Sequence, residues 1–263
     1  MSFIHKDNSA ILFLTHIITE DIILRYKRLL NETSNLYDIY FAFDTTTNQK
    51  DELKSLPHGK SFLFDLQRIM EQGYNPLGNR VMYNVNYVLL LFRKLFPKYD
   101  YYWVIEYDVE FTGSWNIFFN YFETIDADFV SSHIEHISNE NANWCWWNRT
   151  NLSTFGYSNS KMVKSFNPVY RISARALDYM DSVLKKGVQG HFEVIMPTII
   201  SNNTELKILD LGGFGEYSDP SHPNHFYIKG VGVNNGSMRW RPLFLQSCIN
   251  SLKNTNLLFH PVK

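Results

Sequence analysis

The sequence predicts an α/β fold with a mostly parallel central sheet flanked by helices. Three observations support this class. Short apolar runs alternate with helical patterns through the first half of the chain. The runs at 10–15 and 101–105 lack the polar alternation of half-exposed strands, which is typical of buried parallel strands. A chain of 263 residues, 44% of them hydrophobic, has enough apolar material for one such domain.

The first elements form a β-α-β unit. The strand at 10–15 ends in Thr15 and His16, and Thr19 then offers a side-chain oxygen as a helix cap. Apolar residues at helical spacing follow as far as Leu30, and 36–43 predicts a second strand that ends at Asp44.

The next predicted elements continue the alternation. They are a short strand at 61–65, a helix from Asn79 to Phe96, a strand at 101–105, a helix at 115–122 and a strand at 128–132. Pro97 would end the long helix, because proline lacks the N–H that the helix needs.

The second half of the chain is richer in loops. Residues 136–167 show no period, and loops of this length are usually functional or mobile. A strand at 168–171, a helix capped by Ser173 and ended by Gly187, and a strand at 206–211 follow. We therefore expect one domain, with a regular first half at 1–132 and a loop-rich second half at 133–263.

Composition excludes several classes of protein. A net charge of −1 argues against a nucleic-acid-binding protein. No apolar run is long enough to cross a membrane, and the N-terminus has no signal-peptide pattern. With only Cys145 and Cys248, the expected compartment is the cytoplasm, with any membrane attachment peripheral.

The most informative pattern is Glu106-Tyr107-Asp108, directly after the apolar run at 101–105. Ligands of parallel sheets bind beyond the carboxyl ends of the strands. Side chains two residues apart on an extended chain point the same way, so these two carboxylates can share a hard cation such as Mg²⁺ or Mn²⁺. The competing interpretation is a solvated turn, where acidic residues are common.

The segment 103–109 resembles the DxD segment of GT-A-fold glycosyltransferases, with glutamate in the first place. The preceding helix and the segments 111–115 and 127–130 are similar to the same layout, so the resemblance covers about 10–132. It implies a nucleotide-sugar donor, most simply a UDP-sugar, and a Mn²⁺ or Mg²⁺ ion bound by Asp108. Glu106 would assist at the ribose or through water, and it stands where the family more often has aspartate. The resemblance also makes 1–132 the nucleotide-sugar-binding half and 133–263 the acceptor-binding half.

The resemblance also implies that the first strand ends hold the nucleotide. Thr15 and Asp44 would then contact the base or ribose, and Asn79 and Arg80 would face the ribose or phosphates. Each of these can equally be an ordinary polar residue at a strand or helix end.

His260, in the C-terminal segment 259–263, is a second candidate metal ligand, because a neutral imidazole binds ions such as Mn²⁺. GT-A enzymes often use a histidine near the C-terminus in this way. Lys263 could then reach a phosphate oxygen. The alternative is a surface histidine near a chain end.

An inverting transfer needs a base that removes the proton of the acceptor hydroxyl. Glu193 opens an apolar segment that packs back into the protein, so we expect it at the rim of the site. Asp210 and Glu216 are the weaker alternatives. A plain acid at a helix N-terminus is the competing interpretation of Glu193.

The aperiodic loop contains Trp144, Trp146 and Trp147, which can stack on an acceptor sugar or cover the sheet. Residues 239–241 can clamp a diphosphate or form a surface turn.

The sequence thus predicts a glycosyltransferase of the hexosyl or N-acetylhexosaminyl class, acting on a saccharide or other hydroxyl acceptor, as in polysaccharide biosynthesis. The alternative is a binding protein for carbohydrate or nucleotide that has the fold but no turnover. A nucleotidyltransferase is the least favoured hypothesis, because no glycine-rich basic loop follows the first strand.

Overall fold

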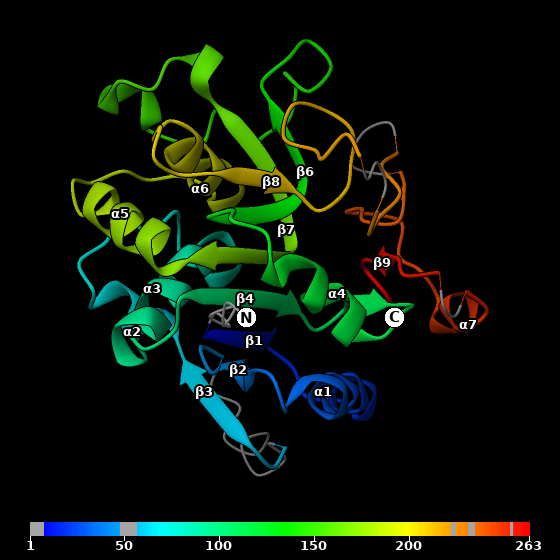
Figure 1. The fold of residues 1–263 in the computed structure, drawn as a ribbon. Coiled ribbons are helices and arrows are strands. Elements are labelled where there is room, and N and C mark those ends of the chain that lie inside the picture. Colours follow the sequence, from blue (N-terminus) through cyan, green and yellow to red (C-terminus); the bar gives the residue numbers. More distant parts are fainter. Residues whose placement is uncertain (1–7, 48–56, 222–224, 231–234, 253–254) are drawn as a thin grey trace, which may run out of the picture.

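The computed structural model describes residues 8–47, 57–221, 225–230, 235–252 and 255–263. Its main sheet has seven strands in the order β3-β2-β1-β4-β7-β6-β8 (Figure 1). The strands are β1 Ser9–Thr15, β2 Asp38–Asp44, β3 Lys60–Phe64, β4 Tyr101–Glu106, β6 Phe129–His136, β7 Val163–Ser173 and β8 Ile208–Asp210. Six of them run in the same direction, and β7 alone is antiparallel to its neighbours β4 and β6. The predicted α/β class with a mostly parallel sheet is confirmed.

Helices cover both faces of this sheet (Figure 1). The helices are α1 Glu20–Thr33, α2 Leu66–Met70, α3 Val85–Leu95, α4 Trp115–Glu123, α5 Ala174–Leu184, α6 Phe192–Ser201 and α7 Gln246–Asn250. Helices α2, α3, α5 and α6 pack over one face, and α1 and α4 pack over the other. Each face therefore has its own apolar core, which holds the strand ends at a fixed edge.

Several predicted helix starts are borne out. Thr19 caps α1 by accepting from the N–H of Ile22, and Ser173 caps α5 by accepting from the N–H of Ala176. Gly187 follows α5 with a φ of 101°, a left-handed conformation that favours glycine.

The predicted helix from Asn79 to Phe96 is wrong in its first turn. A short 3-10 helix occupies Val81–Tyr83, and α3 begins only at Val85. The side chain of Asn84 explains the break, since its amide bonds the carbonyl groups of Leu77 and Arg80 and the N–H of Leu77. These local bonds compete with a continuous helix.

The aperiodic segment is shorter and more ordered than predicted. Strand β7 begins at Val163, so the chain has regained regular structure before 168. The loop before it contains two 3-10 helices, at Leu152–Phe155 and Asn159–Lys161. An antiparallel bridge between Thr150 and Gly190 ties it to the chain just before α6.

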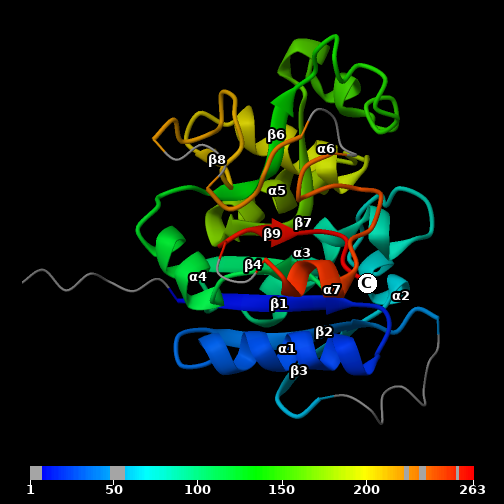
Figure 2. The same cartoon turned by 90° about the vertical axis from the view of Figure 1, so that its right-hand side faces the viewer.

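The C-terminal segment returns to the sheet. Its strand β9 Leu258–Phe259 pairs with β5 Glu110–Phe111, which lies just beyond β4. Figure 2 shows this tail lying in front of the sheet beside β1 and β4. Within the described residues, no helix is both long enough and apolar enough to cross a membrane.

Candidate active site

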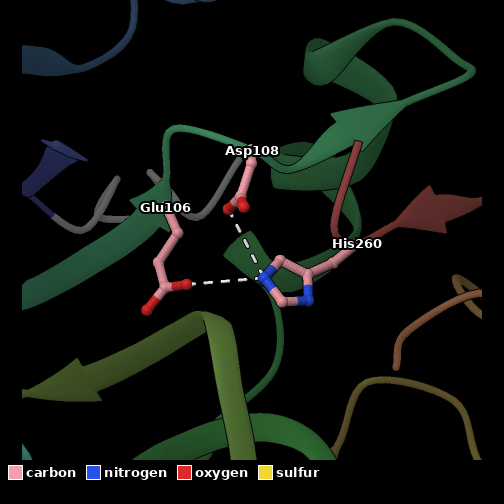
Figure 3. A group of neighbouring side chains, drawn as sticks. All are labelled: Glu106, Asp108 and His260. Carbon is pink, nitrogen blue, oxygen red and sulfur yellow. Dashed lines mark ion pairs between the residues drawn. The ribbon is translucent and has the colours of Figure 1, made fainter. Parts of the chain in front are cut away.

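Strand β4 and the C-terminal tail bring three potential metal ligands together: Glu106, Asp108 and His260 (Figure 3). Glu106 is the last residue of β4, and Asp108 lies in the turn that follows. The tail is fixed against this turn because the N–H of Val262 donates to the carbonyl of Asp108 at 2.8 Å. Residues far apart in sequence therefore converge at the strand end.

One ligand atom from each of the three residues lies within 4.8 Å of the other two. Nε2 of His260 is 3.4 Å from Oδ1 of Asp108 and 3.6 Å from Oε2 of Glu106. Asp108 and His260 are buried, and Oδ1 of Asp108 has no hydrogen-bond partner. A buried carboxylate oxygen of this kind needs a positive charge beside it, which the protonated ring of His260 or a bound cation can supply.

The ring of His260 is oriented by the chain beside it. Its Nδ1 lies 2.9 Å from the carbonyl of Arg239, which can only accept, so Nδ1 carries a proton. A metal ion binds the neutral ring, in which Nε2 then carries the free electron pair, and Nε2 faces the two carboxylates. Histidine ligands of metals are commonly oriented by such a bond from the other ring nitrogen.

Lys263 adds a positive charge to this cluster. Its Nζ lies 3.1 Å from Oδ2 of Asp108 and 3.1 Å from the hydroxyl of Tyr107. Burial alone would raise the pKa of Asp108, but His260 and Lys263 outweigh it and lower the pKa to about 2. Burial would lower the pKa of His260, whereas Asp108 and Glu106 raise it to about 9. The two carboxylates thus create a site that stabilises positive charge.

This donor set fits a divalent cation. Two carboxylates and one imidazole suit Mn²⁺ and similar ions, and carboxylates alone suit Mg²⁺. The unpartnered Oδ1 of Asp108 and the oriented Nε2 of His260 are the two features of this chain that favour such an ion.

Arg25 holds the turn that carries the ligands, and no sequence pattern had pointed to it. From helix α1 it donates to the carbonyl of Tyr107 at 3.1 Å and to Oε1 of Gln246 at 2.7 Å. It also pairs with Glu110 at 3.4 Å. One arginine therefore links α1, the carboxylate turn and the C-terminal segment.

The sequence predicted Glu193 at the rim of the site; in the structure it lies in the first turn of α6, and its side chain is buried. Its Oε1 accepts from the backbone N–H of Asn167 at 3.2 Å. Burial raises the pKa of Glu193 to about 8, and the negative charge of Glu106 adds to the increase. The N–H of Asn167 and the positive charges of Lys164 and His260 oppose it. Glu193 is thus within electrostatic reach of the metal-ligand cluster.

His191 fixes the start of α6. Its Nδ1 accepts from the N–H of Glu193 at 3.4 Å and lies 3.7 Å from Oε2 of the same residue. Burial, aided by Arg149, lowers the pKa of His191 to about 3, so the ring is neutral. The imidazole stacks on Trp146, with ring centroids 3.9 Å apart and planes 17° apart.

The three predicted acceptor tryptophans have different environments. Trp147 is buried, and its indole N–H donates to the carbonyl of Asn141 at 2.9 Å, so it packs in the core and the acceptor prediction is wrong for it. Trp146 is half-buried beside His191. Trp144 is half-buried too, packs edge-on against Trp147 and lies beneath the ammonium group of Lys164.

Thr15 and Asp44 lie at the carboxyl ends of β1 and β2, the same edge of the sheet as Glu106. The hydroxyl of Thr15 donates to the carbonyl of Ile17 at 2.7 Å, and Oδ1 of Asp44 accepts from the N–H of Thr46 at 2.9 Å. Both side chains stabilise local turns, and their contact with a nucleotide stays a prediction.

Asn79 and Arg80 are exposed residues before the 3-10 helix, not the first turn of α3 as the sequence had indicated. Neither side chain is joined to the metal-ligand cluster by a contact within the described residues. Their role at the donor also stays a prediction.

The weaker candidate bases occupy other places. Asp210 is buried and accepts hydrogen bonds from the N–H groups of Ile134, Gly212 and Gly213 and from the hydroxyl of Tyr227. Its carboxylate is therefore used to hold the end of β8. Glu216 is exposed, 3.4 Å from Nε2 of His136. It lines a cavity of about 290 Å³ that contains none of the residues of the metal-ligand cluster.

No family model and no curated protein matches this sequence. Among solved structures, mouse xyloside xylosyltransferase 1 in its apo form is 12% identical, with a TM-score of 0.42 over 78% of this chain and 85% of that chain. The S. cerevisiae mannosyltransferase Ktr4p in complex with GDP is 13% identical, with a TM-score of 0.39 over 70% and 62%. The inositol-1-phosphate CTP transferase from T. maritima is 8% identical, with a TM-score of 0.41 over 84% and 92%. At TM-scores this low, the likeness carries no argument about function.

Proposed function

We propose that this chain is a metal-dependent glycosyltransferase that moves a sugar from a nucleotide-sugar donor, most simply a UDP-sugar, to a hydroxyl acceptor. The observation that carries the proposal is the cluster of Glu106, Asp108 and His260 at the carboxyl edge of the sheet. Ligands of parallel sheets bind at this edge. Asp108 and His260 would hold the ion, and Glu106 would assist them or bind the ribose.

When bound, the ion would offset the negative charge of the donor diphosphate and of the departing nucleoside diphosphate. Lys263 supports the same task from the chain itself. Its ammonium group is already 3.1 Å from Asp108 and is partly exposed, so it can also meet a phosphate oxygen. Arg25 keeps the backbone of the carboxylate turn in place through the carbonyl of Tyr107.

Glu193 would act as the base. Its raised pKa, about 8, suits a carboxylate that takes a proton from a hydroxyl near neutral pH. The N–H of Asn167 holds one oxygen of this carboxyl group in place, and the ring of His191 lies 3.7 Å from the other. Direct attack by the acceptor on the anomeric carbon, with Glu193 removing the proton, would invert the configuration at that carbon.

Product analysis tests this proposal. Wild-type protein, Glu193→Gln and an exposed control, Glu205→Gln, are incubated with Mn²⁺, nucleotide-sugars and a mixture of saccharides. We expect a nucleoside diphosphate and a new glycoside from the wild type and the control only. Binding of nucleotide with no turnover would indicate a binding protein instead, and pyrophosphate release from a nucleoside triphosphate and a sugar phosphate would indicate a nucleotidyltransferase.

A further inference from the structure

Arg149 is an exposed arginine whose side-chain donors make no hydrogen bond within the described part of the chain. Its guanidinium carbon lies 5.2 Å from the ring centroid of Trp146, in a cation–π arrangement. Its backbone N–H donates to the carbonyl of Trp146 at 3.1 Å, which fixes the turn. Stacking on an aromatic ring restrains the guanidinium group while leaving its N–H donors free.

Two other arginines of the chain use their donors internally. Arg93 binds the two oxygens of Asp178 at 3.2 and 3.1 Å, and Arg175 binds both oxygens of Asp128 at 2.6 and 2.7 Å. Arg149 is exposed and has no carboxylate partner among the described residues. Arg149 is therefore positioned by stacking on Trp146, without an anion of the kind that these two arginines bind.

A continuous set of contacts joins Arg149 to the proposed base. Trp146, which lies under the guanidinium group of Arg149, stacks on His191 with ring centroids 3.9 Å apart. His191 in turn lies 3.7 Å from the carboxylate of Glu193. This set of contacts connects a group bound by Arg149 to the carboxyl group that would take the proton of the acceptor hydroxyl.

The described titratable groups around Trp146 and His191 offer no free negative charge to pair with Arg149. His191 is neutral, and burial keeps Glu193 largely protonated at neutral pH. Glu135, which accepts from the side chain of Asn141 in the same loop at 3.4 Å, is paired with Lys164 at 3.0 Å and Lys229 at 2.6 Å. An anion is the ligand that this environment favours.

Resting on the glycosyltransferase function proposed above, we propose that Arg149 binds an anionic group of the acceptor, which is therefore an acidic saccharide. A guanidinium group presents two parallel N–H donors that match a carboxylate or a phosphate. Trp146 restrains the guanidinium group by stacking, and His191 extends the same aromatic surface toward Glu193. Neutral saccharides lack the partner that this arginine requires.

Three methyl glycosides that differ only at one carbon test the proposal: methyl β-D-glucoside, its glucuronide and its 6-phosphate. Their affinities are measured by ligand-observed NMR in the presence of nucleotide and Mn²⁺. We expect the wild type to bind at least one anionic glycoside about 10- to 100-fold more tightly than the neutral one. The order of the two anionic probes distinguishes a carboxylate acceptor from a phosphate acceptor.

Variants give the decisive comparison. Arg149→Gln should bind all three glycosides as weakly as the wild type binds the glucoside, and Arg149→Lys should recover part of the difference. Arg68→Gln, which changes an exposed arginine on α2, should behave as the wild type. Equal binding of the three probes by the wild type, binding of none, or a preference that survives in Arg149→Gln would overturn the proposal. Metal-dependent nucleotide binding by the same samples, measured separately, reports on the glycosyltransferase function independently.

Discussion

Nε2 of His260 lies 3.4 Å from Oδ1 of Asp108, although one residue belongs to the C-terminal tail and the other follows the fourth strand. The contact exists because β9 pairs with β5 and because Val262 bonds the carbonyl of Asp108. The metal-ligand cluster is therefore built by the fold as a whole and depends on the tail being in place.

Replacing Asp108 by asparagine should remove metal binding while leaving the fold intact. The change deletes the negative charge but keeps the shape of a residue at a strand end, outside both apolar cores. Loss of a residue that only hydrogen-bonds a metal ligand lowers metal affinity by up to about 100-fold. Asp108 would be a ligand itself, so we expect the affinity for Mn²⁺ to fall by more than this. Titration calorimetry measures this. Asp126→Asn, an exposed acid paired with Lys207, is the matched control and should bind Mn²⁺ normally.

The rate of transfer should depend on the ionisation of Glu193. A base with a pKa of about 8 must lose its proton to act. We therefore expect kcat/KM to rise about tenfold per pH unit below pH 8 and to level off above it. The pH profile of the wild type measures this, and Glu193→Gln should be slow and should lack this rise. A wild-type profile that is flat between pH 6 and 8 would contradict the assignment of Glu193.

The same residue should make the stability of the fold depend on pH. The pKa of Glu193 is raised from 4.5 to about 8 in the folded protein, so the folded state holds a proton that the unfolded chain releases. Its contribution to stability is complete below pH 4.5 and is lost as the pH rises through 8, by up to about 1.4 kcal/mol per pH unit. Denaturant unfolding in EDTA measures this. Glu193→Gln should gain stability relative to the wild type across that window, and a constant difference would refute the pKa shift.

The neighbouring tryptophans should respond differently to truncation. Trp147 is 4% exposed, so Trp147→Ala should lower the free energy of unfolding by about 3–5 kcal/mol. Trp146→Ala should cost only about 1 kcal/mol but should weaken acceptor binding, because it removes the surface under Arg149 and His191. Unfolding curves and acceptor KM values for both variants measure the contrast. Similar stability losses in the two variants would mean that Trp146 is also a core residue.

Local sequence patterns predicted the sheet and the carboxylate pair. The run at 101–105 is apolar on both faces, so it had to be a central strand, and Glu106 and Asp108 had to lie at its end. Thr19 and Ser173 marked helix starts because their side chains cap the helix by accepting from an N–H group three residues later. The position of His260 rested on a family resemblance, and the metal-ligand cluster now contains it.

Contacts between distant segments were beyond the reach of those patterns. Arg25 looks like any polar residue of an amphipathic helix, and only the fold brings it to the carbonyl of Tyr107. The stacking of Trp146 on His191 likewise depends on how the long loop docks against the start of α6. The false start of the helix at Asn79 arose because periodicity cannot show that Asn84 bonds the backbone before it.

Donor binding with and without metal tests the central claim most directly. The measurement is thermal unfolding of wild-type protein with UDP, GDP, CDP and their sugars, each in Mn²⁺ and in EDTA. A ligand at about 100 times its Kd adds about 2.7 kcal/mol to the free energy of unfolding, which gives a clear shift. We predict a shift with one nucleotide family, seen in Mn²⁺, lost in EDTA and lost in Asp108→Asn. No shift with any nucleotide, or a shift that is the same in EDTA, would contradict a metal-dependent donor site at Glu106, Asp108 and His260.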